Sequence, residues 1–276
     1  MIKHSGSPSS MLLSFTRNQT LIVRMAKREV LARYRGSVIG LAWSFFNPVL
    51  LLLVYTFVFS VVFEARWGGS RFEDSGNNGI FAIMIFTGMI VHALFSECFV
   101  RSPILITSNS NYVKRVIFPL EVLPWVAMGA AVFHAAISII VLLLGLYFMT
   151  GNIPLTALLI PLVFLPLILL TMGFTWFFAA SGVYFRDLSQ LSGFVSTILM
   201  FLSPVFYPLS AIPEAYRSFF YLNPLTYFIE VSRELLVFGQ LPSPGQLAFC
   251  YVVSFSIAWL GFAWFQKTRR GFADVL

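Results

Sequence analysis

Charged residues are scarce in this 276-residue sequence: Asp, Glu, Lys and Arg account for 11% of the chain and hydrophobic residues for 58%. A soluble globular domain carries about 25% charged residues, so this chain lacks the polar surface that a water-soluble fold needs. The composition therefore predicts a polytopic membrane protein. Because this length leaves little outside the bilayer, we expect one all-α membrane domain over residues 1–276 and no separate soluble domain.

Cysteine is also nearly absent. The sequence contains Cys98 and Cys250, both inside apolar runs that we place near opposite membrane faces, so we expect no disulfide between them. It has no G-x-x-x-x-G-K-S/T phosphate loop, which excludes ATP binding in that manner, and no H-E-x-x-H or G-x-S-x-G motif. We therefore expect this chain not to be an enzyme and to hold no catalytic residue, metal or cofactor.

Long apolar runs, by contrast, are abundant. A helix needs roughly 20 apolar residues to cross about 30 Å of hydrocarbon, and six runs meet this requirement, although the fifth is short and ends at the motif SPVFYP. The six predicted transmembrane helices cover residues 38–63, 80–100, 120–150, 156–184, 192–208 and 246–266. Residues 1–37 and 267–276 are then the two tails.

Lysine and arginine are distributed unequally between the two sides of this topology. If the N-terminus is cytoplasmic, fourteen of the 18 lie in cytoplasmic segments, and four lie in the outer segments 64–79 and 209–245. Cytoplasmic loops of membrane proteins are enriched in these residues, so we predict that both termini are cytoplasmic. This placement of the charges explains the net charge of +7 without a nucleic-acid partner.

The basic segment before the first apolar run, at about residues 20–35, is predicted to be an amphipathic helix in the headgroup plane. Its expected apolar and cationic faces are, respectively, Ile22, Val23, Ala26, Val30 and Tyr34, and Arg24, Lys27, Arg28 and Arg35. Glu29 and Arg33 are spaced for a favourable pair along the helix. Positive-inside anchoring alone would explain the same cations. A signal peptide is disfavoured because the apolar run is too long and no small-residue cleavage site follows it.

The outer segment 209–245 is predicted to contain two short amphipathic helices that dip into the outer leaflet or lie on it. In the second, Asn223 is the expected N-cap, Pro224 the first helical residue and Gly239 the stop. The helix is too short to cross the membrane with its charged residues inside. An ordinary extracytoplasmic loop is the alternative, although loops of this length are usually functional or disordered.

Polar side chains inside the predicted spans are few. His92 and His134 lie in the second and third spans, where interhelical hydrogen bonding is favoured over a proton relay. Glu97 and Arg101 are spaced i,i+4 near the cytoplasmic end of the second span, and we expect them to pair with each other. A proton-coupled transporter would need more carboxylates at mid-membrane, so this function is disfavoured.

Aromatic residues are frequent, with 31 Phe, 10 Tyr and 6 Trp. Most aromatics of membrane proteins face lipid or form interfacial belts, but some could line a path for sugars, whose C–H faces stack on rings. The candidates for such a path are Trp43, Phe46, Phe57, Phe201, Phe206 and Tyr207.

Four stretches of the sequence resemble one family. They are YRGSVIGLAWSFFNPVLLLLVYTFVF in the first span, SNYVKRVIFPLEVLP before the third, FRDLSQL after the fourth, and SPVFYPLSAIPEAYRSFFYLNPLTYFIEVSRELL beyond the fifth. Together they cover most of residues 30–240 and are similar to the membrane (permease) subunits of bacterial polysaccharide ABC exporters. The likeness is strongest to the Wzm-type O-antigen permeases.

This resemblance implies a homodimer in the bacterial inner membrane, with a pore between two six-span subunits. Two copies of a separate ATPase would bind ATP and Mg and drive export of a polysaccharide carried on undecaprenyl pyrophosphate. The basic helix would act as a cytoplasmic gate whose cations meet the diphosphate; these are Arg24, Lys27, Arg28, Arg33 and Arg35.

The resemblance further implies that the loop 101–119 couples the chain to the ATPase and that the two outer helices form an extracytoplasmic gate. The coupling residues would be Asn109, Asn111, Tyr112, Lys114 and Arg115, and the gate residues Tyr216, Phe220, Glu230, Arg233 and Glu234. An exporter of teichoic acid, capsule or a smaller lipid or drug would share this fold. An ion-coupled carrier would need no ATPase.

Overall fold

The computed structural model describes residues 6–62, 79–113 and 118–275, and this part of the chain is almost entirely helical, without strands. Five helical segments in it are long and apolar enough to cross a membrane. They are Gly40–Phe59, Gly79–Ile104, Val122–Thr150, Leu155–Tyr184 and Pro244–Val275. The predicted all-α membrane protein is confirmed at this level, and each segment overlaps one of the predicted spans.

The predicted fifth span, 192–208, corresponds to the shorter helix α7 (Leu188–Phe201). Its 14 residues cover about 21 Å at a rise of 1.5 Å per residue, which is less than the hydrocarbon thickness. The helix ends before Pro204, because a proline disfavours helical geometry in the residue that precedes it. The count of six spans therefore stays a prediction.

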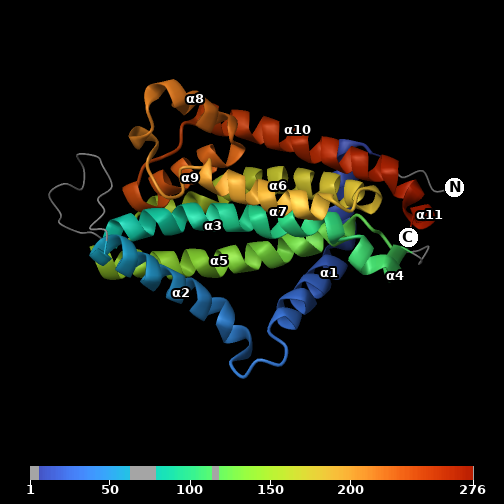
Figure 1. Ribbon diagram of the computed structural model, residues 1–276, viewed down its shortest axis with the longest axis horizontal. Helices are drawn as coiled ribbons and strands as arrows, with labels where there is room; N and C mark the ends of the chain where they lie inside the picture. The colour runs from blue at the N-terminus through green and yellow to red at the C-terminus, as the bar shows by residue number, and fades with distance from the viewer. Residues whose placement is uncertain (1–5, 63–78, 114–117, 276) are drawn as a thin grey trace.

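The long helices run side by side along one axis, and short elements lie at the two ends (Figure 1). The bundle contains α3 (Gly79–Arg101), α5 (Val122–Thr150), α6 (Ile160–Tyr184), α7 and α10 (Pro244–Thr268). The short helices α4 (Ser110–Val113) and α11 (Phe272–Val275) lie at one end, and α8 (Glu214–Leu222) and α9 (Pro224–Arg233) lie toward the other.

Helix α1 (Pro8–Arg33) crosses the bundle at a steep angle and packs on α5 (Figure 1). It starts twelve residues before the predicted helix, because Ser7 caps its first turn and Pro8 occupies the first helical position. Ile22 and Val30 are buried, as predicted, but Val23 is exposed. The crossing orientation is the one expected of a helix that lies along a membrane surface.

Small residues allow the tightest contact of the bundle, which is between α6 and α10. A Cβ atom on Gly261 would lie 2.0 Å from the carbonyl oxygen of Gly173, so the two backbones touch there. Helices pack in membranes through such small residues, because burial from water supplies no driving force inside lipid. Of these two helices, α6 also packs against α3.

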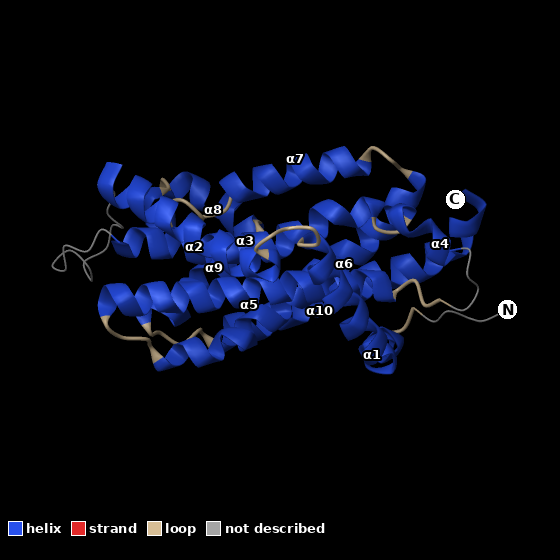
Figure 2. Ribbon diagram, turned by 90° about the horizontal axis from the view of Figure 1, so that it is seen from below, coloured by secondary structure: helices blue, strands red, loops and turns tan. Residues whose placement is uncertain are grey.

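Helix α3 and helix α2 (Trp43–Tyr55) differ most in burial. The span that contains α3 is 83% buried within the subunit, whereas the span that contains α2 is 17% buried. Figure 2 shows α7 at another edge of the bundle, and this helix also exposes large apolar side chains. The apolar faces of α2 and α7, and also that of α10, whose span is 22% buried, are therefore left for lipid or for another protein chain.

The structure contains the two short helices predicted for residues 209–245, whose position on the outer side stays a prediction. Asn223 caps α9 by accepting a hydrogen bond from the Leu225 amide (3.0 Å), and Pro224 is the first residue of the helix. The chain continues through a π-helical turn, Glu234–Phe238, and stops at Gly239, whose φ of 68° lies in the left-handed region. The depth of these helices in the membrane stays a prediction.

Candidate functional site

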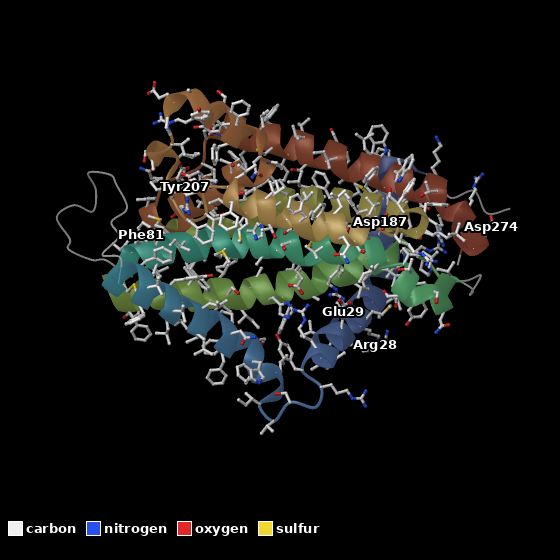
Figure 3. The ribbon with its side chains drawn as sticks, in the orientation of Figure 1. Arg28, Glu29, Phe81, Asp187, Tyr207 and Asp274 are labelled. Atoms are coloured by element: carbon white, nitrogen blue, oxygen red, sulfur yellow. The ribbon has the colours of Figure 1, made fainter. Side chains whose placement is uncertain are left out.

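Four of the five cations predicted to meet a substrate have exposed side chains on α1 or on the turn after it. Arg24, Lys27, Arg28 and Arg35 are exposed, and Figure 3 shows Arg28 and Glu29 near the lower end of α1. Arg33 differs, because it turns toward α3 and α5. The predicted cations therefore do not form one uniform face, because Arg33 contacts α3 and α5.

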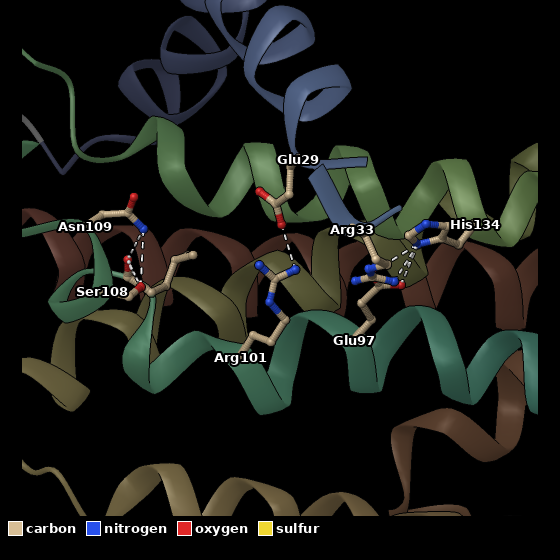
Figure 4. Close-up of polar contacts among 8 residues, drawn as sticks. Glu29, Arg33, Glu97, Arg101, Ser108, Asn109 and His134 are labelled. Carbon is tan, nitrogen blue, oxygen red and sulfur yellow. Dashed lines mark hydrogen bonds and ion pairs between the residues drawn. The ribbon is translucent and has the colours of Figure 1, made fainter. Parts of the chain in front are cut away.

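Arg33 belongs to a three-residue network that joins α1, α3 and α5 (Figure 4). Its Nη2 atom lies 2.5 Å from Oε1 of Glu97, and Nδ1 of His134 lies 3.0 Å from Oε2 of the same carboxylate. A carboxylate only accepts hydrogen bonds, so Nδ1 of His134 carries the proton and donates it. This interhelical hydrogen bond is the kind that the sequence predicted for His134.

Both ion pairs predicted along single helices are wrong. Arg101 pairs with Glu29 of α1, at 2.6 Å between Nη1 and Oε1, and Glu97 pairs with Arg33. The i,i+4 pairs would lie on one helix surface and contribute only a few tenths of a kcal/mol. The crossing of α1 over α3 instead brings opposite charges together between helices.

The predicted coupling residues lie at the end of the molecule that carries α4. Arg28 donates a hydrogen bond to the hydroxyl of Tyr112 (3.1 Å), which raises the pKa of Arg28 further above its ordinary value. Tyr112 stacks on Phe118 with ring centroids 4.4 Å apart, and Asn111 is exposed. The loop is thus attached to α1 and still presents polar side chains.

Of the three remaining coupling residues, only Asn109 lies in the described part of the chain. Asn109 donates its side-chain amide to the carbonyl of Leu105 (2.9 Å), which holds the loop in a compact turn. Lys114 and Arg115 lie outside the described residues.

At the other end, Arg233 is the most buried charged residue of α9, with 1% of its side chain exposed. It donates to the carbonyl oxygens of Met84 (3.1 Å) and Val205 (2.8 Å) and to the carboxylate of Glu230 (2.8 Å). Burial lowers the pKa of Arg233 to about 10, so the guanidinium stays charged at neutral pH. Burial also raises the pKa of Glu230 above its ordinary value, although Arg233 opposes that change.

Gly88 makes this arrangement possible. A Cβ atom there would lie 3.2 Å from the Arg233 guanidinium and 3.2 Å from the Cα atom of Val205. Asn223 adds a second link, because its amide donates to the hydroxyl of Ser203 (2.8 Å) in the loop after α7. Helix α9 is therefore bound to α3 and to that loop through buried polar contacts.

The other predicted gate residues are more accessible. Tyr216 is exposed on α8, Glu234 is half-buried, and Phe220 packs edge-on against Tyr207 with centroids 6.0 Å apart. Burial raises the pKa of Glu234.

The six predicted pore aromatics fall into two groups. Phe201, Phe206 and Tyr207 follow one another near the end of α7, with 5.9 Å between the centroids of Phe201 and Phe206. Trp43 and Phe46 lie in the first turns of α2 and Phe57 lies in the π-helical turn that follows it. Phe46, Phe57 and Phe201 are exposed on the subunit surface, so their surroundings depend on what covers α2 and α7.

Sequence reasoning missed a row of serines that attaches α7 to α3. Ser196 donates to the hydroxyl of Ser96 (2.8 Å), Ser192 donates to the carbonyl of Val100 (3.3 Å), and Nε2 of His92 bonds the carbonyl of Ser196 (3.1 Å). The spacing of Ser192 and Ser196 was the available signal, because residues four apart share a helix face. The interhelical bond predicted for His92 is confirmed.

A second contact that the sequence did not predict joins the start of α5 to the C-terminal end. Arg269 forms an ion pair with Glu121 and donates to the carbonyl of Phe118 (3.1 Å). Within the described ranges no three His, Cys, Asp or Glu side chains are grouped to hold a metal ion.

Comparison with known proteins agrees with this architecture. Residues 20–237 match the ABC-2 type transporter family. The O-antigen export system permease protein RfbA of Myxococcus xanthus is 30% identical over 92% of this chain and 94% of that protein. RfbA of Klebsiella pneumoniae is 26% identical over 93% and 95%, respectively.

The polysialic acid transport protein KpsM of Escherichia coli is 24% identical over 88% of this chain and 91% of its own. The resemblance seen in the four sequence stretches is therefore confirmed at the family level. With five apolar helices of spanning length and a family match over most of its length, the chain belongs to the ABC-2 type transporters and is a multi-pass membrane permease domain.

Proposed function

We propose that this chain is the permease subunit of an ATP-driven exporter that moves an O-antigen-like polysaccharide, carried on undecaprenyl pyrophosphate, across the bacterial inner membrane. The observation that carries the proposal is the basic helix α1, which crosses one end of the bundle with cations exposed. The names of the relatives from Myxococcus and Klebsiella support the polymer class.

ATP hydrolysis is assigned to a separate subunit present in two copies, which binds ATP and Mg. The absence of a phosphate loop from this sequence supports that division of labour. The segment from Arg101 to Val113, together with Lys114 and Arg115, is the proposed docking element, because Asn111 and its neighbours extend from the end where α4 and α11 lie.

A second copy of the chain would complete the pore. The exposed apolar faces of α2 and α7 support this assignment, since each subunit leaves them uncovered. In such a dimer the aromatic residues on and after these helices would line the path of the sugar chain. Helices α8 and α9 would close its outer end.

Both termini are proposed to be cytoplasmic. The starting residues of α1 pack against α10 near its last turns, where Trp259 donates to the carbonyl of Gly6 (3.0 Å), so the two ends of the described chain share one side of the molecule. A reporter fused after Leu276 should be cytoplasmic and one inserted near Asn77, which lies outside the described residues, extracytoplasmic. Opposite readings at both sites would invert the topology.

Gene disruption tests the function itself. Loss of this chain, or of its ATPase partner, should leave lipid-linked polymer inside the cell while synthesis continues, and the wild-type gene should restore surface polymer. Export that continues without the ATPase would select an ion-coupled carrier. Accumulation of a different lipid-linked polymer, such as a capsule or teichoic acid, would replace O-antigen as the cargo; the similarity to KpsM makes capsule the first alternative.

A further inference from the structure

A groove of about 820 Å³ lies between α9 and the first turns of α10, at the end of the molecule that carries α8 (Figure 1). Its volume is within the range of roughly 300–1,000 Å³ that small-molecule sites occupy. Three residues spaced four apart on α10 line it, namely Gln246, Cys250 and Ser254. Since each helical residue adds 1.5 Å, this row covers about 12 Å along the helix. The groove is therefore elongated and follows a helix of membrane-spanning length.

The groove is acidic. Glu230 and Glu234 line it, and among the described residues no lysine or arginine does. Arg233 pairs with Glu230 at 2.8 Å, whereas Glu234 has no ion-pair partner in the described part of the chain. Burial and the neighbouring Glu230 raise the pKa of Glu234, as expected for a carboxylate that lacks a cation. One negative charge is thus left without a partner, and the groove favours a cationic ligand.

The hydroxyl of Tyr227 is a second polar group without a partner in this groove. Its oxygen is buried, and within the described ranges no hydrogen-bond donor or acceptor reaches it. Burial, with smaller effects of Cys250 and Glu234, raises the pKa of Tyr227 to about 12, so the hydroxyl is protonated and can donate. Buried polar groups of native proteins are rarely left without a hydrogen bond. The hydroxyl therefore indicates a ligand with a polar atom at this point.

Aromatic and aliphatic side chains make up much of the remaining wall. Tyr221 and Phe249 line the groove and are exposed. Leu170 of α6 and Val253, nine residues after the first residue of α10, line it as well. Aromatic faces attract ammonium groups, and aromatic side chains are enriched at the level of the lipid headgroups. This combination fits a molecule that has a cationic head and an apolar tail.

We propose that the groove binds a phospholipid whose headgroup carries a primary ammonium, with the ammonium between Glu230 and Glu234 and an acyl chain along α10. A primary ammonium has three N–H donors, which the two carboxylates accept, and the hydroxyl of Tyr227 donates to the lipid phosphate. Carboxylates repel an anionic headgroup, and a choline headgroup has no N–H to donate. In the proposed topology the lipid comes from the outer leaflet. The proposal requires a bilayer around the chain and is independent of the cargo.

The two native cysteines provide the test. Cys98 is fully buried and Cys250 lines the groove, so alkylation of the full-length chain by a maleimide measures whether the groove is filled. In nanodiscs of phosphatidylcholine, added phosphatidylethanolamine should slow the alkylation of Cys250. Its N-methyl and N,N-dimethyl derivatives should protect progressively less, because each methyl group removes one N–H donor. This series uses the wild-type chain, so its result does not depend on the folding of a variant.

A matched pair of carboxylate variants tests the position of the ammonium. Glu234→Gln should increase the amount of phosphatidylethanolamine needed for half-protection about tenfold, the loss expected for one charge-assisted hydrogen bond. The control is Glu214→Gln, which changes a carboxylate on α8 that is 90% exposed and does not line the groove. This control should leave the protection unchanged.

Four results would overturn the proposal. Equal protection across the N-methyl series would remove the role of the N–H donors, and equal protection by phosphatidylglycerol would show that the groove accepts any lipid. Equal protection by soluble ethanolamine would replace the lipid by a free amine. Equal shifts in Glu234→Gln and Glu214→Gln would show that the surface as a whole, and not this groove, attracts the ammonium.

Discussion

Arginine side chains attach α1 and α9 to α3 at opposite ends of the molecule, but the two ends use them differently. At the outer end Arg233 is 1% exposed and donates to two backbone carbonyls as well as to Glu230. At the end that carries α1, Arg33 and Arg101 are 41% and 39% exposed, and their partners are the carboxylates of Glu97 and Glu29.

The difference separates a permanent attachment from an exchangeable one. A buried charge that loses its partners cannot regain water, so breaking such a contact costs about 3–5 kcal/mol. The Glu29–Arg101 pair is partly exposed, and such pairs exchange with water and with other ions at a cost of about 0–1 kcal/mol, whereas the Glu97 carboxylate beside Arg33 is mostly buried. We therefore expect α9 to stay on α3 throughout transport, whereas the Glu29–Arg101 contact between α1 and α3 can open.

The largest effect is expected for Arg233→Met. This change leaves the carbonyls of Met84 and Val205 and the Glu230 carboxylate without their donor, so the free energy of unfolding in detergent should fall by about 3–5 kcal/mol. Arg233→Lys should rescue it only in part, because one ammonium cannot reach three separated acceptors with the same geometry.

Arg217 provides the matched control for the outer end. It lies on α8, has 36% of its side chain exposed, and donates to the carbonyl of Ile212 (2.9 Å). Arg217→Met should change the free energy of unfolding by less than about 1 kcal/mol. Equal losses for the two arginine variants would remove the distinction between the attachments.

An intermediate effect is expected for Glu97→Gln. The carboxylate is mostly buried and accepts from both Arg33 and His134, and hydrogen bonds to charged groups contribute about 1.5–3 kcal/mol. Equilibrium unfolding of Arg33→Ala, Glu97→Gln and the double variant should show strong non-additivity, because the two residues share one network. Additive losses would mean that the pair contributes no coupling energy.

A smaller effect on stability is expected for Glu29→Gln, under about 1 kcal/mol, because its pair with Arg101 is partly exposed and poorly aligned. The same measurement as for Glu97→Gln makes the two carboxylates directly comparable. A loss as large as that of Glu97→Gln would show that α1 is attached as permanently as α9.

No loss of stability is expected for Asn111→Cys, since this side chain is exposed. The cysteine should crosslink to the ATPase in membranes if the loop docks there. Ser218→Cys, also exposed but on α8 at the outer end, is the control and should not crosslink to it. Crosslinking at Ser218→Cys and not at Asn111→Cys would show that the ATPase docks at the end that carries α8, which would contradict the proposed docking loop.

Much of the architecture follows from local features of the sequence. Apolar runs of membrane length predict the long helices because each must satisfy its own backbone hydrogen bonds in lipid. Asn223, Pro224 and Gly239 mark the limits of an outer helix because cap chemistry involves only neighbouring residues. The four family stretches were likewise sufficient to recognise the family that the comparisons confirmed.

The tertiary structure decided which charges meet. Glu29 and Arg33, and likewise Glu97 and Arg101, are spaced to pair along their own helices, yet each carboxylate pairs with the arginine of the other helix. The spacing of residues along the chain predicts only which side chains are neighbours on one helix. The crossing of α1 over α3 depends on how side chains of both helices pack, so the pairs between the helices could not be predicted from spacing. The burial of Arg233 beside Gly88, and the groove that α9 shares with α10, exist only because distant segments meet.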